Sequence, residues 1–363
     1  MKEEREIVSV SLPLFCGAFL GTFLTAVPAL RYPAAAASCC SALLGACLLF
    51  LLSGRGRRYA AVVALFGLTG LFCGLNGAFS AAGDGALPGR VSAASDALRR
   101  TVRAIPFPSD ETGALVLALT TGDRSLLDRE AVQVFRQSGA SHLLALSGLH
   151  LGILYLLLSW LTKPLGNSIL AKRFRSVFLM VAAGAYALVT GASPSIVRAF
   201  LFILLRETGL LLGRRPAPLR ILCGALTLQV ALTPSVVTSV GFQLSYLAVA
   251  GIVLLYPRMR AWYPSEGPRR DRWNLPRRLW DMMALTLSCQ VFTGPLAWLR
   301  FGTFPRYFLL TNLLAMPLAS ALAALSAVCV LLSALGCCPA WAFVADDVLA
   351  RLLLQALGII ATM

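Results

Sequence analysis

Long runs of apolar residues follow one another along most of the chain. Residues 59–81 and 236–256 are two such runs, and each has about the length that an α-helix needs to cross the hydrocarbon of a bilayer. The pattern predicts an all-α fold, a polytopic transmembrane bundle of about 10–11 helices. The predicted spans are residues 8–30, 33–53, 59–81, 142–161, 177–192, 195–213, 219–233, 236–256, 280–299, 309–334 and 341–361.

The composition agrees with a membrane protein and excludes two other classes. Hydrophobic residues make up 58% of the 363 residues and charged residues only 13%, and the mean hydropathy is +0.77. A soluble domain carries about a quarter charged residues. The chain is therefore neither a soluble globular enzyme nor a disordered protein.

The excess of basic residues predicts the orientation of the chain. The formal net charge is +16, from 32 Lys and Arg against 16 Asp and Glu. With the N-terminus in the cytoplasm, the four strongly basic short loops at 55–58, 163–175, 214–220 and 258–278 all fall on the cytoplasmic side, as the positive-inside rule requires. A surface that binds polyanions such as nucleic acid is the second interpretation of this charge.

One long segment between the third and fourth spans is predicted to lie outside the membrane, with short helices within 91–137. The first of these helices is amphipathic and rich in arginine, and such helices commonly lie along a membrane surface. The predicted boundaries are 91–104 for the amphipathic helix and 111–121 and 125–137 for two shorter helices, with an N-cap at Ser109 or Asp110.

Polar residues inside the spans are the first candidates for function, because a polar group in hydrocarbon is costly and marks a pathway or a partner. The two histidines, His142 and His150, lie in the span SHLLALSGLHLGIL together with Ser147 and Gly148. This helix either bonds tightly to its neighbours or turns a polar stripe toward an aqueous path, and the sequence leaves both open. A third interpretation is an intramembrane hydrolase with Ser147 as nucleophile, but it lacks a Gly-x-Ser-x-Gly motif and an acidic third member.

Four isolated polar residues lie in three further spans. Arg198 follows a Ser-Pro-Ser break at Pro194, which favours a buried or pore-facing position over a lipid-facing one. Gln243 and Ser245 lie in VGFQLSYLAVAGI, and Asn312 lies in LLTNLLAMPLA. Helices that each turn one polar stripe inward would form a hydrophilic conduit.

No metal or cofactor site is predicted. The ten cysteines lie mainly in apolar runs, where cysteine behaves as a small hydrophobe. None has the spacing of a zinc site. We expect no metal ion, no cofactor and no catalytic residue.

Five segments in a fixed order carry a family resemblance. They are TTGDRSLL, GASHLLALSGLHLGIL, GASPSIVRAFLF, SVGFQLSYLAVAGIVLLYP and PLAWLRFGTFPRYFLLTNLLAMPLA. From about residue 110 to about residue 330 the chain resembles the competence domain of the ComEC-type DNA-uptake channel family. The segment SHLLALSGLH is the most specific part of this resemblance.

The resemblance implies a multi-pass channel that moves single-stranded DNA across the bacterial inner membrane during natural transformation. The implied partners are single-stranded DNA and the lipid bilayer, with a DNA receptor, a separate nuclease, a cytoplasmic DNA translocase and further copies of the chain. A transporter or permease of a small solute is the alternative, ahead of the serine hydrolase. Carried over residue by residue, the DNA route includes His142, Ser147, Gly148, His150, Arg198, Gln243, Ser245 and Asn312.

The sequence departs from the family pattern in two places. Members often carry an extracellular OB-like domain and a metallo-β-lactamase-like domain. Residues 82–110 are too few for the first, and no His-x-His-x-Asp-His run marks the second, so we expect neither domain and no enzymatic activity. The expected regions are an N-terminal three-helix region at 1–81, an extracytoplasmic linker at 82–110, a competence-type channel domain at 111–334 and a C-terminal helix at 335–363.

Overall fold

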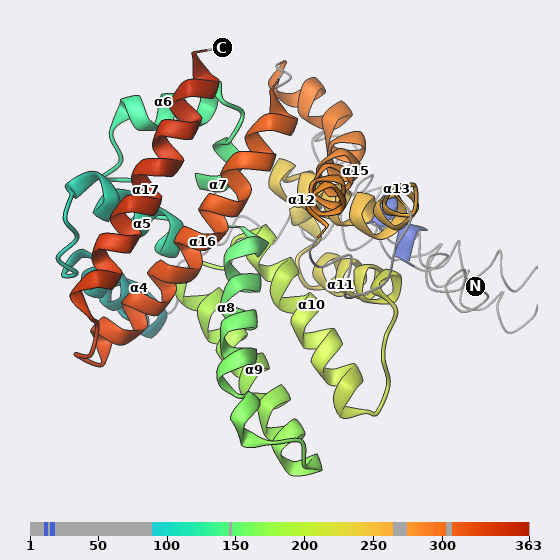
Figure 1. The fold of residues 1–363 in the computed structure, drawn as a ribbon. Coiled ribbons are helices and arrows are strands. Elements are labelled where there is room, and N and C mark those ends of the chain that lie inside the picture. Colours follow the sequence, from blue (N-terminus) through green and yellow to red (C-terminus); the bar gives the residue numbers. More distant parts are fainter. Residues whose placement is uncertain are drawn as a thin grey trace, which may run out of the picture. The chain divides into compact units, whose positions relative to one another are not determined.

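Every regular element that the structure describes is a helix (Figure 1), which confirms the predicted all-α fold. The computed structural model describes residues 11–13, 15–18, 89–144, 147–263, 274–302 and 307–362. The spans predicted at 33–53 and 59–81, and most of the span at 8–30, lie outside the described residues.

The chain divides into two compact units. The larger unit comprises Leu87–Phe200 and Gly251–Met363, and the smaller unit comprises Met1–Ala86 and Leu201–Ala250. In the larger unit lie α4 (Gly89–Arg103), α5 (Asp110–Thr121), α6 (Arg129–Gln137), α7 (Ser141–Leu144), α8 (Gly148–Leu161), η2 (Lys163–Leu165), α9 (Ile169–Val189), α13 (Tyr256–Arg260), α15 (Leu275–Phe301), α16 (Phe308–Ala334) and α17 (Ala340–Ala361). The smaller unit contains α11 (Pro218–Leu232) and η3 (Pro234–Thr238), while α10 (Pro194–Leu211) and α12 (Val240–Leu254) each have residues in both units.

The core of the larger unit forms around α16 and α17, which pack side by side (Figure 1). The short helices α5, α6 and α7 contribute buried side chains to the same core. After its acidic and exposed first turn, helix α5 is apolar and buried continuously from Ala114 to Leu119, although its length is far below that of a membrane span. The core residues are Leu115, Leu119, Phe135, Ala140, Leu143, Leu144, Ala315, Ala319, Leu322, Ala350, Leu353 and Leu357.

A buried polar contact also joins α5 to α17. The hydroxyl of Ser109 accepts a hydrogen bond from the backbone N–H of Thr112, so Ser109 is the N-cap of α5 as predicted. The hydroxyls of Ser109 and Thr112 both donate to Oδ1 of Asp347, at 2.8 and 2.6 Å. Oδ2 of Asp347 lies 2.7 Å from Nη2 of Arg351. Since charge-assisted hydrogen bonds are the strong ones, this contact fixes the start of α5 against α17.

Helix α4 is the amphipathic helix that the sequence predicts. Its apolar face packs against other helices of the larger unit: Val102 is buried in a cluster with Val116 and Leu117, and Leu98 and Val330 pack against them. The protein itself therefore covers the face that the sequence pattern assigned to a membrane surface.

The continuous helix predicted over 142–161 is wrong. Helix α7 ends at Leu144 and α8 begins at Gly148. The apolar run continues through this point, so hydropathy alone cannot show the interruption. The local reason for the new helix is Ser147, a residue type that is strongly preferred at helix N-caps.

Three helices in the described part are long and apolar enough to cross a membrane. They are Gly148–Leu165, Leu275–Phe301 and Phe308–Ser333. Two shorter apolar helices, Pro218–Leu232 and Val240–Leu254, are present as well. The chain is a multi-pass membrane protein by this measure, and the predicted count of spans stays a prediction.

The smaller unit has its own buried cluster. Val230 of α11 and Phe242 and Tyr246 of α12 pack with Ala18 from the first predicted span. The Tyr246 hydroxyl donates to Oε1 of Gln229 at 2.9 Å, so a hydrogen bond crosses between α11 and α12 within this apolar cluster.

Candidate functional site

Ser147 and His150 form a capping box at the start of α8. The Ser147 hydroxyl accepts from the backbone N–H of Leu149 at 3.3 Å, and the Nδ1 atom of His150 accepts from the backbone N–H of Ser147 at 3.2 Å. The two side chains approach each other at 3.4 Å, between Oγ and Nδ1. The sequence carries a signal for this arrangement, because Ser-x-x-His matches the spacing of a capping box, in which Glu or Gln is usual at the fourth position.

Arg198 lies directly over the first residue of α8. A Cβ atom placed on Gly148 would be 2.9 Å from Nη2 of Arg198 and 3.2 Å from Cβ of Ala199. Only a glycine leaves room for the guanidinium at this position, and we therefore call Gly148 the seat of Arg198. Arg198 is 9% exposed and His150 is 7% exposed. The structure thus brings four predicted site residues together: Ser147, Gly148, His150 and Arg198.

The turn before α10 brings Arg198 to this position. Helix α9 ends at Val189, and α10 begins at Pro194, which suits the first turn of a helix because proline has no N–H to satisfy there. Gly191 and Ala192 both have positive φ values, 86° and 49°, and the backbone N–H of Ala192 donates to the carbonyl of Ala187 at 2.8 Å. A positive φ is uncommon outside glycine and signals a constrained backbone. The predicted break is therefore a tight turn between α9 and α10.

The TTGDRSLL segment contacts the end of α7, three residues before Ser147 along the chain. Gly122 ends α5 in the left-handed conformation, with a φ of 78°, and its N–H donates to the carbonyl of Ala118 at 3.0 Å. Nε of Arg124 then donates to the carbonyl of Leu144, the last residue of α7, at 3.1 Å. Arg124 was not among the predicted site residues. A Gly-Asp-Arg turn carrying a charge next to the motif is the signal that could have identified it. We name Arg124, Ser147, Gly148, His150 and Arg198 the α8 cluster.

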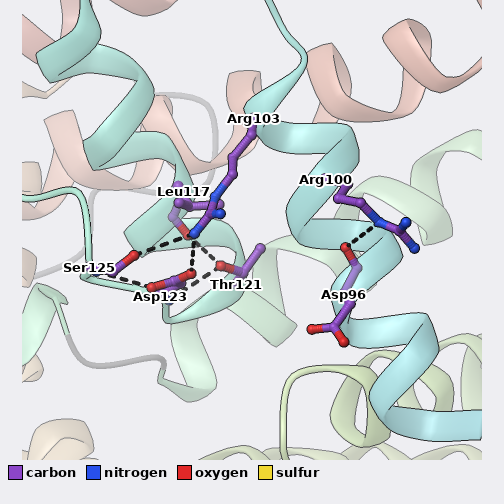
Figure 2. A network of polar contacts seen from close by, with 7 residues as sticks. All are labelled: Asp96, Arg100, Arg103, Leu117, Thr121, Asp123 and Ser125. Atoms are coloured by element: carbon purple, nitrogen blue, oxygen red, sulfur yellow. Dashed lines mark hydrogen bonds and ion pairs between the residues drawn. The ribbon is translucent and has the colours of Figure 1, made fainter.

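Asp123 holds the TTGDRSLL turn in shape (Figure 2). Its Oδ1 accepts from the backbone N–H of Ser125, and its Oδ2 lies 3.0 Å from Nη2 of Arg103 on α4. The hydroxyl of Thr121 accepts from the backbone N–H of Asp123 at 3.2 Å. Hydrogen bonding from the side chain of Ser125, then from its backbone, lowers the pKa of Asp123, and nearby Arg99 and Arg103 act in the same direction. Asp123 is therefore ionised at neutral pH.

Two further predicted residues of the larger unit have separate surroundings. His142 is exposed, and its Nδ1 lies 3.3 Å from the carbonyl of Gly139. Asn312 is half-buried on α16, next to Thr311, whose hydroxyl donates to the carbonyl of Ser138 at 2.7 Å. This bond ties the start of α16 to the end of α6.

The remaining two predicted residues belong to the smaller unit. Nε2 of Gln243 donates to the backbone carbonyl of Val237 at 2.8 Å, so this amide stabilises the junction between η3 and α12. Ser245 is half-buried on α12. Among the described residues no group of three or more His, Cys, Asp or Glu could hold a metal ion.

The comparison with known proteins agrees with the order of the motifs. The "Competence protein" family matches residues 119–363, which is more than half of the chain and includes every residue of the α8 cluster. The chain belongs to the Competence protein family. This confirms the resemblance seen in the sequence. No solved structure matches the chain.

Three curated relatives match shorter stretches of the chain. ComE operon protein 3 of Bacillus subtilis is 33% identical over 148 residues, which are 41% of this chain and 19% of that protein. The uncharacterized protein YcaI of Escherichia coli is 26% identical over 221 residues, 59% of this chain and 28% of that protein. Recombination protein 2 of Haemophilus influenzae is 26% identical over 213 residues, 57% of this chain and 26% of that protein. The matches span less than a third of the length of each relative.

Proposed function

We propose that this Competence protein forms a route for single-stranded DNA through the bacterial inner membrane, with the α8 cluster on that route. Membership in the family supports a role in DNA uptake. The proposed partners are single-stranded DNA, the surrounding lipid, a DNA receptor, a separate nuclease, a cytoplasmic translocase and further copies of the chain.

The observation that carries the proposal is the seat of Arg198 on Gly148. The guanidinium is a permanent positive charge, and it lies at the N-terminus of α8, where the helix dipole also favours anions. Arginine recognises phosphate through its planar fork of donors. Gly148 leaves room for the guanidinium, and α10, which begins at Pro194, carries it. A positive charge in this position is suited to binding the phosphates of a single strand inside an apolar protein.

The test measures uptake of labelled DNA by cells whose own copy of the gene is deleted and which express either the parent chain or a variant. We expect R198Q to lower uptake at least about tenfold, the effect of roughly 1.4 kcal/mol at a rate-limiting contact, while the amount of protein in the membrane stays unchanged. R198K keeps the charge but loses the fork, so its uptake should be intermediate. R173Q, at an exposed position on α9, is the matched control and should keep full uptake. Full uptake by R198Q would remove the α8 cluster from the route.

Salt dependence separates DNA from a small solute as the substrate. Binding of single-stranded oligonucleotides to the purified chain should weaken steeply as salt rises, because phosphate contacts release counterions. A shallow dependence would favour the small-solute transporter.

We further propose that Ser147 has no role as a nucleophile. Its hydroxyl accepts from the N–H of Leu149, and the Nδ1 of His150 accepts from the N–H of Ser147, so both groups are used in the cap. Covalent labelling of Ser147 by a serine-reactive phosphonate would contradict this proposal.

A further inference from the structure

An exposed tryptophan lies at the corner between α13 and α15. The indole of Trp262 follows α13 and is 72% exposed. One of its faces stacks on Trp280 of α15, with ring centroids 6.3 Å apart and an interplanar angle of 29°. Nε1 of Trp280 donates to the carbonyl of Met259 at 3.0 Å, so the backbone of α13 holds the Trp280 ring in place. The result is a fixed aromatic surface that presents one large ring to its surroundings.

The segments that carry this aromatic pair are rich in arginine. Arg258 on α13 and Arg278 on α15 are exposed. Arg260 is exposed too and forms an ion pair with Asp281 at 3.2 Å. In the described part of this corner, four arginines accompany a single acidic residue: Arg258, Arg260, Arg277, Arg278 and Asp281.

Buried contacts hold the base of the corner in place. Arg277 donates to the backbone carbonyl of Tyr263, and its guanidinium lies 5.7 Å from the centre of the Tyr263 ring. Asn274 caps the start of α15 by accepting from the backbone N–H of Arg277 at 3.1 Å. The exposed ring and the exposed arginines therefore project from a support that needs little reorganisation to bind a ligand.

We propose that α13 and the first turns of α15 form a stacking surface for single-stranded DNA, on which Trp262 packs against a base and Arg258 and Arg278 bind phosphates. Aromatic side chains combined with positive charge are the chemistry that binds single strands without regard to sequence. The positive-inside pattern predicts that this basic corner faces the cytoplasm, the side toward which the strand moves. The inference rests on the proposed function, because it names a site for the same substrate beyond the α8 cluster.

A membrane surface is the competing partner, since tryptophans and arginines also gather at the lipid headgroups. The stacked pair favours the nucleic acid. An interfacial tryptophan needs only its N–H near water, whereas here a second ring, itself held by a backbone hydrogen bond, supports Trp262 from one side.

The experiment measures binding of a fluorescein-labelled oligothymidylate to the full chain in nanodiscs of zwitterionic lipid. W262A should weaken binding about 5- to 100-fold, the range for loss of one stacked base. W262F keeps an aromatic ring and should retain most of the affinity. W298A is the matched control, because Trp298 is 62% exposed near the far end of α15 from the corner, and it should leave the affinity unchanged. R278Q should reduce the slope of log affinity against log salt by about one phosphate contact, whereas R173Q should not.

Equal affinities of W262A and W298A for the oligonucleotide would overturn the inference. Quenching by brominated lipids provides the second readout: the difference between the parent chain and W262F reports how deeply Trp262 enters the lipid. Quenching of Trp262 as strong as that of Trp298 would make it a lipid anchor and also overturn the inference. Neither result touches the proposed function, which depends on uptake by the Arg198 variants.

Discussion

Replacing Gly148 by alanine tests the seat of Arg198 directly. The new Cβ would stand 2.9 Å from Nη2 of Arg198 and 3.2 Å from Cβ of Ala199. The guanidinium can swing away at modest cost, but Ala199 is fixed to α10, so its methyl group moves only if the helix moves. Overpacking of this kind costs about 1–3 kcal/mol. We expect G148A to destabilise the chain within that range and to displace Arg198.

Gly152, on the same helix, is the matched control. A Cβ placed there meets no atom within 4 Å, so G152A gains helix propensity, about 0.5–1 kcal/mol, without a clash. Unfolding by sodium dodecyl sulfate in mixed micelles, followed by circular dichroism, should therefore separate the two variants by about 1.5–4 kcal/mol. DNA uptake should fall in G148A and persist in G152A.

A double-mutant cycle shows whether the clash involves the guanidinium. In an R198A background the closest atom is gone, so G148A should cost less than it does in the parent chain. Equal stability and equal uptake of G148A and G152A would refute the reasoning. A cost of G148A that is the same with and without Arg198 would assign the clash to Ala199 alone.

Two further predictions concern the polar contacts that hold α5 and the TTGDRSLL turn. D347A removes the acceptor of the Ser109 and Thr112 hydroxyls and should lower the free energy of unfolding by about 2–3 kcal/mol. R351A removes the exposed partner of Asp347 and should lower it by about 1 kcal/mol or less. Similar losses in the two variants would contradict the prediction. The lowered pKa of Asp123 means that its ionised form stabilises the fold above the ordinary aspartate pKa and that this contribution is lost as the pH falls through the lowered value. An acid titration of the unfolding free energy from about pH 5 downward should therefore be flatter in D123N than in the parent chain, and identical profiles would contradict it.

The candidate site was only partly visible in the sequence. Ser147, Gly148, His150 and Arg198 could be selected because polar or small residues stand out in apolar runs. The pairing of Gly148 with Arg198 could not be predicted, since it depends on the turn that places the start of α10 against the start of α8. Arg124 was not predicted, because its side chain donates to the backbone carbonyl of Leu144. Every residue has a backbone carbonyl, so the sequence does not show which one accepts this hydrogen bond.

The sequence alone determined the helical membrane class, the family and, to within two residues, the bounds of α4, α5, α10, α11, α16 and α17. Helix α6 begins four residues later than predicted and α9 eight residues earlier. These properties depend on local hydropathy, on caps such as Ser109 and on the order of motifs, all of which are written along the chain. The tertiary structure decided that α5 is buried against α16 and α17, that the apolar face of α4 packs on protein, and that Ser147 is an N-cap rather than part of a continuous helix. An apolar surface gains similar free energy from lipid or from protein, so hydropathy does not specify its partner. Only the packed neighbours do.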